Sequence, residues 1–508
     1  MPEEGPSDFI SRAVDERSFW GGNRAVVSGM APRDECSPPL PAAPSAGARN
    51  VLTLHVVGDQ LLRVSRDAAS PALQLDRVPL ADATRVETSA ALDLSRLADA
   101  EAHGCVLGAG WGNAIFGSGH YAYLPHYVTE LSDPVNVRTQ SYLTLYVIDL
   151  QDPEQLRVER SISMDPLDDY GNFSGILQTE HALLVGRTQN HEGGSPSLAY
   201  DIFDLSDPGA PRLRTRFDVP HFRGDAWAAP GDSLNSPFAN GPGRYDHARA
   251  QVAGDLIVSQ HLEALNDGTG LVRYYLDRLD VSDPAHPQLL PPINMPGTLV
   301  HFLPATGELV TVDYELGSEP GTEQADCQYR GAYGSYDYEA NDCSVFYRRL
   351  NSLVLAGDRA LLRSQVPLDR SRHASNLAAS DARVFFTTSQ FPPPFNPVTS
   401  DHGPDAQLPS EVQLESLRLE QGRLVALPSL VLRSVPNDGA YSGLLLAQGD
   451  RALEIAVGSL RAIGSADPLA PVQLSQPVPD NELSMLEFVG NKAYAAISTR
   501  GIEIIELP

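Results

Sequence analysis

The chain has little positive charge, and lysine is almost absent. Its 508 residues include 37 Lys and Arg against 65 Asp and Glu, which gives a formal net charge of −28. Such a balance repels phosphate backbones and anionic membrane surfaces, so nucleic acid is not an expected partner. Lys492 is the only lysine, so a Schiff-base or phosphate-binding lysine has a single position available.

Long apolar runs are also missing. No stretch reaches the roughly 18 apolar residues that a membrane-spanning helix requires, so no transmembrane segment is expected. The first residues, Met1-Pro2-Glu3-Glu4, are polar and acidic, where an export signal is basic and then apolar. Two interpretations follow: a cytosolic protein, or one whose export signal precedes the displayed start.

The signatures of common enzymes do not occur. The chain contains no G-x-S-x-G, H-E-x-x-H or G-x-x-x-x-G-K-[ST]. These motifs place a nucleophile, a zinc site or a phosphate-binding loop. Their absence weakens the hydrolase and nucleotide-binding interpretations.

Cysteines number only four. Cys327 and Cys343 bracket a loop rich in Gly, Tyr and Asp, without any C-x-x-C pair. Two thiols alone make a poor zinc site, so we predict a disulfide between them. A second disulfide, Cys36 with Cys105, would use the remaining pair. Disulfides favour an oxidising compartment, so the expected location is extracellular, periplasmic or at the cell surface.

Residues 1–50 differ from the rest and are interpreted as an N-terminal extension. Asp8 to Phe19 has the pattern of a short amphipathic helix with Ser7 as its N-cap. The stretch Cys36 to Pro44 is rich in Pro and Ala and predicts a linker.

Residues 51–508 repeat one local pattern, in which two apolar runs flank a short turn of Gly, Asp, Asn, Ser, His or Glu. Small or left-handed turn residues between strand-like runs predict a β-hairpin. Long helix-period segments are lacking, and the best candidate, Ala90 to Glu101, is interpreted as a connection. The predicted hairpins cover residues 52–64, 114–124, 175–185, 250–260, 302–312, 376–387, 444–457 and 486–497.

A second unit, with an Asp-Pro turn, follows several of these hairpins. Its copies are Leu150 to Pro153, Ser206 to Pro211, Val281 to Pro287 and Ser465 to Pro471. Asp or Ser starts such a turn and Pro fixes φ at its second position, so the role is structural. Two hairpins make four antiparallel strands, and their repetition predicts an all-β fold, a β-propeller. We expect seven blades, with eight as the alternative; a two-sheet sandwich would not need so many copies.

The C-terminal run Phe488 to Ile505 resembles the LVIVD-type propeller repeat of bacteria and archaea. That family has a Gly-Asn-x-Ala-Tyr hairpin followed by a strand that ends in Asp-x-Ser-Asp-Pro-x-x-Pro. Asp204 to Pro211 and Asp280 to Pro287 match the second half, while the copies around Cys327 and Glu411 have lost it. The resemblance covers most of residues 51–508. It implies a propeller, commonly secreted or surface-anchored, without common catalytic residues.

Three consecutive hairpins carry a histidine six or seven residues before the turn: His247, His301 and His373. Equivalent points of neighbouring blades converge on the channel of a propeller. Three imidazoles there would bind Zn, Cu or Fe with an open coordination position. The alternative is that each histidine hydrogen-bonds a backbone group at a blade corner.

A compact acidic loop contains Asp165, Asp168 and Asp169, and oxygen-rich loops of this kind can hold Ca²⁺. Its spacing does not fit an EF-hand, so a solvated acidic turn is the alternative.

The insertion Glu315 to Tyr347 is distinctive because it concentrates tyrosine between the two cysteines: Tyr329, Tyr333, Tyr336 and Tyr338. Tyrosine supplies a large contact area at low entropic cost, so the loop is a candidate recognition surface. The alternative is a lid packed on its own propeller. A second insertion, Phe391 to Gly403, is expected beside it.

Three functional hypotheses remain. The first is an exported, non-catalytic propeller that binds a protein or glycan ligand, or acts as a scaffold, through loops on one face. The second is a metal-dependent oxidoreductase or hydrolase that uses the three histidines. The third is a calcium-stabilised adhesin.

Overall fold

The computed structural model describes most of the strand-forming part of the chain. The described residues are 9–12, 50–66, 73–80, 90–94, 97, 105–111, 115–133, 138–152, 154–168, 171–189, 197–219, 250–265, 271–320, 334–337, 342–369, 372–390, 395–396, 401–402, 410–435, 443–449, 451–456, 459–463, 471–473, 483–497 and 501–506. Within these ranges no helix is long and apolar enough to cross a membrane.

The described strands form eight antiparallel sheets of three or more strands, each built from one contiguous stretch of chain except that β1 adds to the sheet of β16 to β19. Sheets I and II contain β2 (Asn50–Val57), β3 (Gln60–Arg66), β4 (Leu73–Pro79) and β5 (Ala90–Asp93), then β6 (Cys105–Trp111), β7 (Phe116–Ser118), β8 (Tyr121–Asp133), β9 (Arg138–Asp149), β10 (Arg157–Ser163) and β11 (Leu167–Asp168). Sheets III and IV contain β12 (Gly171–Gln178), β13 (Ala182–Gln189), β14 (Ser197–Asp204) and β15 (Arg212–Asp218), then β16 (Gln251–Ala253), β17 (Leu256–Ala264), β18 (Leu271–Asp280) and β19 (Gln288–Met295).

The second half of the chain continues in the same way. Sheets V and VI contain β20 (Thr298–Leu303), β21 (Glu308–Pro320), β22 (Gly334–Asp337), β23 (Asp342–Ala356) and β24 (Arg359–Pro367), then β25 (Arg372–Ser380), β26 (Arg383–Gln390), β29 (Ser410–Glu420), β30 (Arg423–Ala426) and β31 (Leu430–Val435). Sheets VII and VIII contain β32 (Gly443–Gln448), β33 (Arg451–Ala456), β34 (Ser459–Ile463) and β35 (Pro471–Gln473), then β36 (Leu483–Val489), β37 (Lys492–Ile497) and β38 (Gly501–Glu506).

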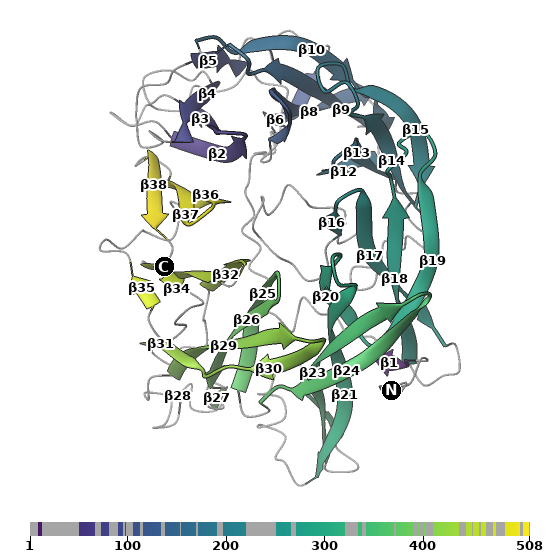
Figure 1. The fold of residues 1–508 in the computed structure, drawn as a ribbon, viewed down its shortest axis with the longest axis vertical. Coiled ribbons are helices and arrows are strands. Elements are labelled where there is room, and N and C mark those ends of the chain that lie inside the picture. The colour runs from purple at the N-terminus through teal and green to yellow at the C-terminus, as the bar shows by residue number, and fades with distance from the viewer. Residues whose placement is uncertain are drawn as a thin grey trace.

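The sheets follow one another around a ring, with the first strand of each toward the centre (Figure 1). Among the described residues, apolar clusters lie between all neighbouring sheets except VII and VIII. One of them joins Leu62 and Leu75 of sheet I to Leu124 and Ile148 of sheet II. A ring of sheets that pack face to face in this way defines the fold as a β-propeller, and the sheets are its blades.

The described strands form eight blades, so the expected number of seven is wrong and the alternative of eight is correct. The prediction of seven allowed the first and last hairpins to share one blade. Instead β2 to β5 and β36 to β38 form separate sheets, which pack against each other through Leu54, Leu61 and Tyr494. Side-chain packing between the first and last blades thus closes the described ring.

All eight predicted turn hairpins are confirmed, and each is the first hairpin of its blade. Except at Glu180-His181, these turns contain a residue with left-handed backbone, such as Gly58 with φ of 61° and Gly254 with φ of 63°. Asp381 takes the same conformation without being glycine, with φ of 45°.

The Asp-Pro units join the third and fourth strands of a blade, as predicted. Asp204 Oδ1 accepts a hydrogen bond from the Ser206 N–H at 2.7 Å, and the Asp207 carbonyl accepts one from the Ala210 N–H at 2.9 Å. The unit also contacts the preceding blade, because the Tyr123 hydroxyl donates to the Pro208 carbonyl at 2.9 Å. The local turn therefore also fixes the spacing of two blades.

The helix expected over Asp8 to Phe19 is wrong where the structure describes it. Residues 9–12 are extended, and β1 (Ser11–Arg12) pairs with Leu271 and Val272 of β18. A strand edge offers the segment backbone partners that an isolated short helix does not have. Ala90–Asp93, placed in a connection from sequence, likewise forms a strand, β5.

Candidate functional site

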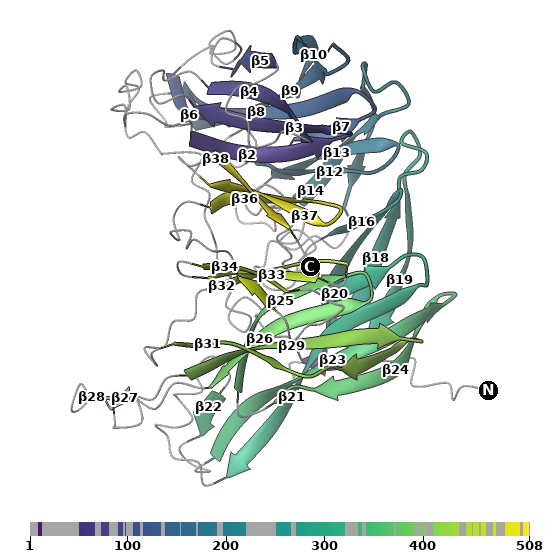
Figure 2. The ribbon, with the colours of Figure 1, turned by 60° about the vertical axis from the view of Figure 1, so that its left-hand side comes forward.

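The two ends of the strands carry different kinds of connection. The turn hairpins and the Asp-Pro corners lie at one end, which we call the corner face. Connections between second and third strands, and between blades, lie at the other end, which we call the loop face. The second-to-third connections are longest in blades V and VI, where residues 321–341 and 391–409 separate strands of the blade. Figure 2 shows β22, β27 and β28 on this side of the molecule.

The Tyr-rich insertion begins as a ribbon that extends beyond its blade. The pairing of β21 with β23 continues to Pro320 opposite Asp342, although the pairing of β20 ends at Val312 and that of β24 at Arg349. β22 adds a third strand against Asp342 to Val345. We call Tyr314–Pro320, Gly334–Asp337 and Asp342–Arg348 the ribbon; at about 3.4 Å per residue it extends on the order of 20 Å past the blade (Figures 1 and 2).

Charge fixes the base of the ribbon. Asp313, 1% exposed, accepts hydrogen bonds on Oδ2 from Arg349 Nη2 at 2.7 Å and Nε at 3.2 Å. The neighbouring Arg348 Nη1 donates to the Ala374 carbonyl of blade VI at 2.9 Å. Two adjacent arginines thus attach the ribbon to its own blade and to the next one.

An aromatic ring covers the backbone one step further out. A Cβ added to Gly317 would lie 1.9 Å from the Tyr347 ring, so the ring occupies the space that a side chain would take. Glycine at this strand position permits the close approach of the ring. The base of the ribbon is therefore packed as well as paired.

Only some of the predicted recognition and disulfide residues are among the described ones. Tyr336 lies in β22, opposite Cys343 of β23. Cys105 lies in β6, opposite Leu131. Tyr329, Tyr333, Tyr338, Cys36 and Cys327 lie outside the described residues. Both disulfides stay predictions. The second insertion forms a small hairpin of β27 (Phe395–Asn396) and β28 (Asp401–His402).

Two of the three predicted metal-binding histidines lie on first strands of adjacent blades, His301 in β20 and His373 in β25. His247 lies outside the described residues, and the side chain of His373 is not described. Convergence of the three rings therefore stays a prediction.

His301 itself has an unusual environment. Its Nε2 is buried without a hydrogen-bond partner among the described residues. Burial lowers the pKa of the ring, against the opposing effects of a hydrogen bond to the Asp381 backbone and of the Asp381 charge. A ring that donates from Nδ1 to a carbonyl keeps the Nε2 lone pair free, which is the arrangement a metal ligand needs.

The acidic loop proposed for calcium is partly described. The Asp165 carboxylate lies 3.4 Å from Arg216 Nη2, and its carbonyl accepts a hydrogen bond from Arg187 at 3.0 Å. Asp168 lies in β11, opposite Gln140, and Asp169 is outside the described residues. The calcium site stays a prediction, with two guanidinium groups beside it.

A different group of possible metal ligands was not predicted. Among the described residues, Glu180, His181 and Asp255 form the one group of three whose ligand atoms lie within 4.8 Å of one another. His181 Nδ1 is 2.6 Å from Asp255 Oδ2, and the backbone N–H of His181 donates a hydrogen bond to Asp255 Oδ1 at 3.0 Å. Hydrogen bonding to Asp255 raises the pKa of His181. Glu180 and His181 belong to the first-hairpin turn of blade III, and Asp255 belongs to that of blade IV. Both turns were located from the sequence, so an alignment of the two hairpins on their turns could have indicated this group.

Polar pairs inside the blades were also missed. Each joins the second and third strands of one blade, and at least one member is almost fully buried. The pairs are Arg63–Asp76, Arg187–Asp201, His261–Asp277 and Arg349–Asp313. From the sequence, only the recurrence of charged residues at similar strand positions could have indicated these pairs.

Comparisons with known proteins were made for the sequence and for the fold. No protein-family model matches the chain, and no curated protein matches it. Among solved structures, the chain is similar to one of two prolyl endopeptidases described in a mechanistic study, with 11% identity and a TM-score of 0.37 over 88% of this chain and 54% of that one. The chain thus spans about half the length of that protein.

Two further structures are covered almost completely. One is the β-propeller domain of the Trilobed protease from Pyrococcus furiosus, with 10% identity, a TM-score of 0.33, and coverage of 85% of this chain and 97% of that one. The other is a putative 6-phosphogluconolactonase from Bacteroides fragilis, with 8% identity, a TM-score of 0.30, and coverage of 92% and 100%. Such low similarity carries no functional argument, and the class of the protein, a β-propeller, follows from its own topology.

Proposed function

We propose that the chain is a rigid, exported propeller that binds a protein or glycan partner through its loop face and does not catalyse a reaction. The observation that carries this proposal is the ribbon, in which β21 and β23 stay paired to Pro320 and Asp342, well past the end of their blade. The outer part of the ribbon projects from its blade, and projecting loops on rigid scaffolds commonly carry binding sites.

The base of the ribbon supports a binding role. Asp313, Arg349 and Tyr347 hold it in one direction before any partner arrives. A preorganised element loses less conformational entropy on binding than a free loop of the same length. The net charge of −28 favours a partner with a basic surface and speeds its association at low salt.

The ribbon also offers backbone for recognition. β1 lies beside β21, and from Glu315 to Pro320 no described strand is paired with the edge of β21 opposite β23. Such an edge can pair with an extended segment of another chain, with main-chain hydrogen bonds providing the affinity. A protein ligand fits this edge directly, whereas a glycan would use the tyrosines.

Removal of the ribbon tests the proposal. Tyr314 pairs with Arg348, so replacing residues 315–347 by Asn-Gly closes a two-residue hairpin and keeps the contact of Arg348 with blade VI. The matched control is His286→Ser at the corner face, where the side chain is 79% exposed. Immobilised wild type and control should retain the same ligand from a glycan array or a secreted-protein library, and the ribbon variant should lose it. Equal capture by all three, or turnover of a substrate by pure protein, would contradict the proposal.

A metal-dependent enzyme is the second candidate, and the free Nε2 of His301 is the observation that favours it. It predicts about one equivalent of Zn, Cu or Fe in gently purified protein. Elemental analysis of wild type and His301→Gln decides between the two candidates, since less than about a tenth of an equivalent in the wild type would exclude the enzyme.

A further inference from the structure

The N-terminal segment docks on a blade that is complete without it. Blade IV already has its four strands, β16 to β19. β19 pairs with Tyr274 to Asp280 of β18, and β1 continues the same edge at Leu271 and Val272. The docked residues therefore occupy an extra position at the loop-face end of β18. Thirty-seven residues, 13–49, separate them from the next described strand.

One side chain of the blade binds the backbone of this segment. Asn294 Oδ1 accepts a hydrogen bond from the Phe9 N–H at 2.5 Å, and its Nδ2 donates to the Phe9 carbonyl at 3.1 Å. The same Nδ2 donates to the Tyr274 carbonyl at 3.1 Å, which fixes the orientation of the amide. An amide held in this way pairs with both backbone groups of one residue, whatever its side chain.

The side chains of the segment alternate between buried and exposed. Phe9 is 8% exposed and packs in the apolar cluster of blades IV and V with Val272, Met295 and Leu299. Ile10 is 47% exposed. Ser11 is 4% exposed, and its Oγ accepts a hydrogen bond from the Gly297 N–H at 3.0 Å. The site thus selects an aromatic residue and, two positions later, a small hydroxyl residue, and it leaves the residue between them free.

We propose that this edge of blade IV is a docking site for an extended segment of another protein with the pattern aromatic, any residue, Ser or Thr, and that Phe9 to Arg12 occupy it in cis. The mode is strand addition, in which backbone pairing gives affinity and alternate side chains give specificity. The tether gives the cis segment an effective concentration on the order of millimolar, so any segment that binds in trans must displace it. The site lies beside β21, which continues into the ribbon, but its hydrogen bonds come from Asn294, Gly297 and β18, which the removal of residues 315–347 leaves in place.

Full-length Phe9→Ala vacates the site and tests the proposal. The probe is a fluorescein-labelled synthetic peptide with the sequence of residues 7–14. We expect it to bind Phe9→Ala at least about tenfold more tightly than wild type, where the cis segment competes. Ile10→Ala should behave like wild type. A peptide with Ala in place of its Phe, or the added substitution Asn294→Leu, should weaken binding at least about tenfold.

A second measurement covers the case in which Phe9→Ala does not fold. A protease site inserted between Pro41 and Ala42 allows the segment to be released from the folded wild type. The released fragment should leave on gel filtration while the melting temperature of the propeller changes little, and the peptide should then bind. Unfolding after release would overturn the proposal, as would equal binding of both peptides to Phe9→Ala. A wild-type dimer that Phe9→Ala abolishes would instead identify a second copy as the occupant.

Discussion

The buried pair inside blade III leads to a quantitative prediction. Asp201 in β14 accepts hydrogen bonds from Arg187 Nη1 at 3.0 Å and from Arg216 Nε at 2.6 Å. The side chains of Asp201 and Arg187 are 2% and 9% exposed, whereas that of Arg216 is 44% exposed. Asp201→Ala therefore leaves one guanidinium buried without its counter-charge and lets the other turn to water.

The magnitude follows from this difference in burial. Breaking a buried ion pair from one side costs about 3–5 kcal/mol, because the remaining charge stays desolvated. The half-exposed Arg216 adds at most about 1 kcal/mol. We expect Asp201→Ala to lower the free energy of unfolding by about 4 kcal/mol. The double variant Arg187→Leu with Asp201→Leu should recover most of this loss, since an apolar pair removes both buried charges.

A matched control lies in the same sheet. Arg214 Nη2 is 2.6 Å from Asp204 Oδ2, but the arginine side chain is 41% exposed. Arg214→Ala should cost no more than about 1 kcal/mol. Urea unfolding at pH 7, followed by circular dichroism, measures all four proteins. If Asp201→Ala costs no more than Arg214→Ala, burial does not set the strength of these pairs and the reasoning fails.

Two further predictions concern single positions. A Cβ on Gly297, where φ is 66°, would lie 1.9 Å from the Val312 carbonyl oxygen, so Gly297→Ala should lower the free energy of unfolding by about 2–4 kcal/mol in thermal unfolding. The control Gly254→Ala has φ of 63° and nothing within 4 Å of the added Cβ, so it should cost only about 1 kcal/mol. Equal costs for the two variants would contradict the steric argument. Burial lowers the pKa of His301 below its ordinary value of 6.5. As the pH falls below 6.5, the unfolded state therefore binds the proton before the folded state does. The contribution of the neutral His301 ring to stability is present above pH 6.5 and is lost as the pH falls through the folded pKa. His301→Gln should lose less stability than wild type between pH 7.5 and pH 5 in urea titrations, and an unchanged pH dependence would exclude this residue as the cause.

The features that depend on local chemistry could be predicted from the sequence. A two-residue turn with Gly58 or Gly254 needs only a residue that tolerates positive φ between two apolar runs, so the first hairpin of every blade was located. The Asp-Pro corners were located for the same reason, since Asp204 and the Ser206 N–H are only two residues apart. The turn sequence alone determines such contacts.

The features that depend on distant contacts could not be predicted. The number of blades is decided by whether the first and last hairpins pair, which the local pattern does not encode. Residues 9–12 are extended because β18 offers them an edge 260 positions away, as Ser11 pairs with Val272. The pair of Asp201 with Arg187 could not be predicted either, because the two residues lie on different strands. Only an alignment of the blades on one another would have shown that charged residues recur at this depth.

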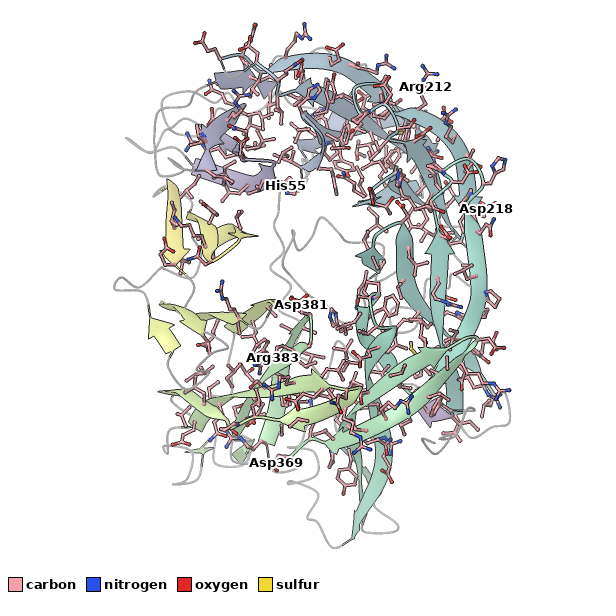
Figure 3. The ribbon with its side chains drawn as sticks, in the orientation of Figure 1. His55, Arg212, Asp218, Asp369, Asp381 and Arg383 are labelled. Carbon is pink, nitrogen blue, oxygen red and sulfur yellow. The ribbon has the colours of Figure 1, made fainter. Side chains whose placement is uncertain are left out.

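The corner face and the loop face of the propeller differ in how closely their connections pack against the neighbouring blades. At the corner face the turns are short and bonded to the neighbouring blade, as the Tyr123 hydroxyl is to the Pro208 carbonyl. A Cβ on Gly209 there would lie 2.7 Å from the Tyr121 ring, so the position does not accept even a methyl group. Figure 3 labels Arg212, at the start of the strand β15 that follows this turn. At the loop face the ribbon leaves blade V, and β1 docks at the same end of β18 in blade IV. Because these blades are neighbours, a partner that displaces the N-terminal segment arrives beside the ribbon, and both contacts would then contribute to one interface.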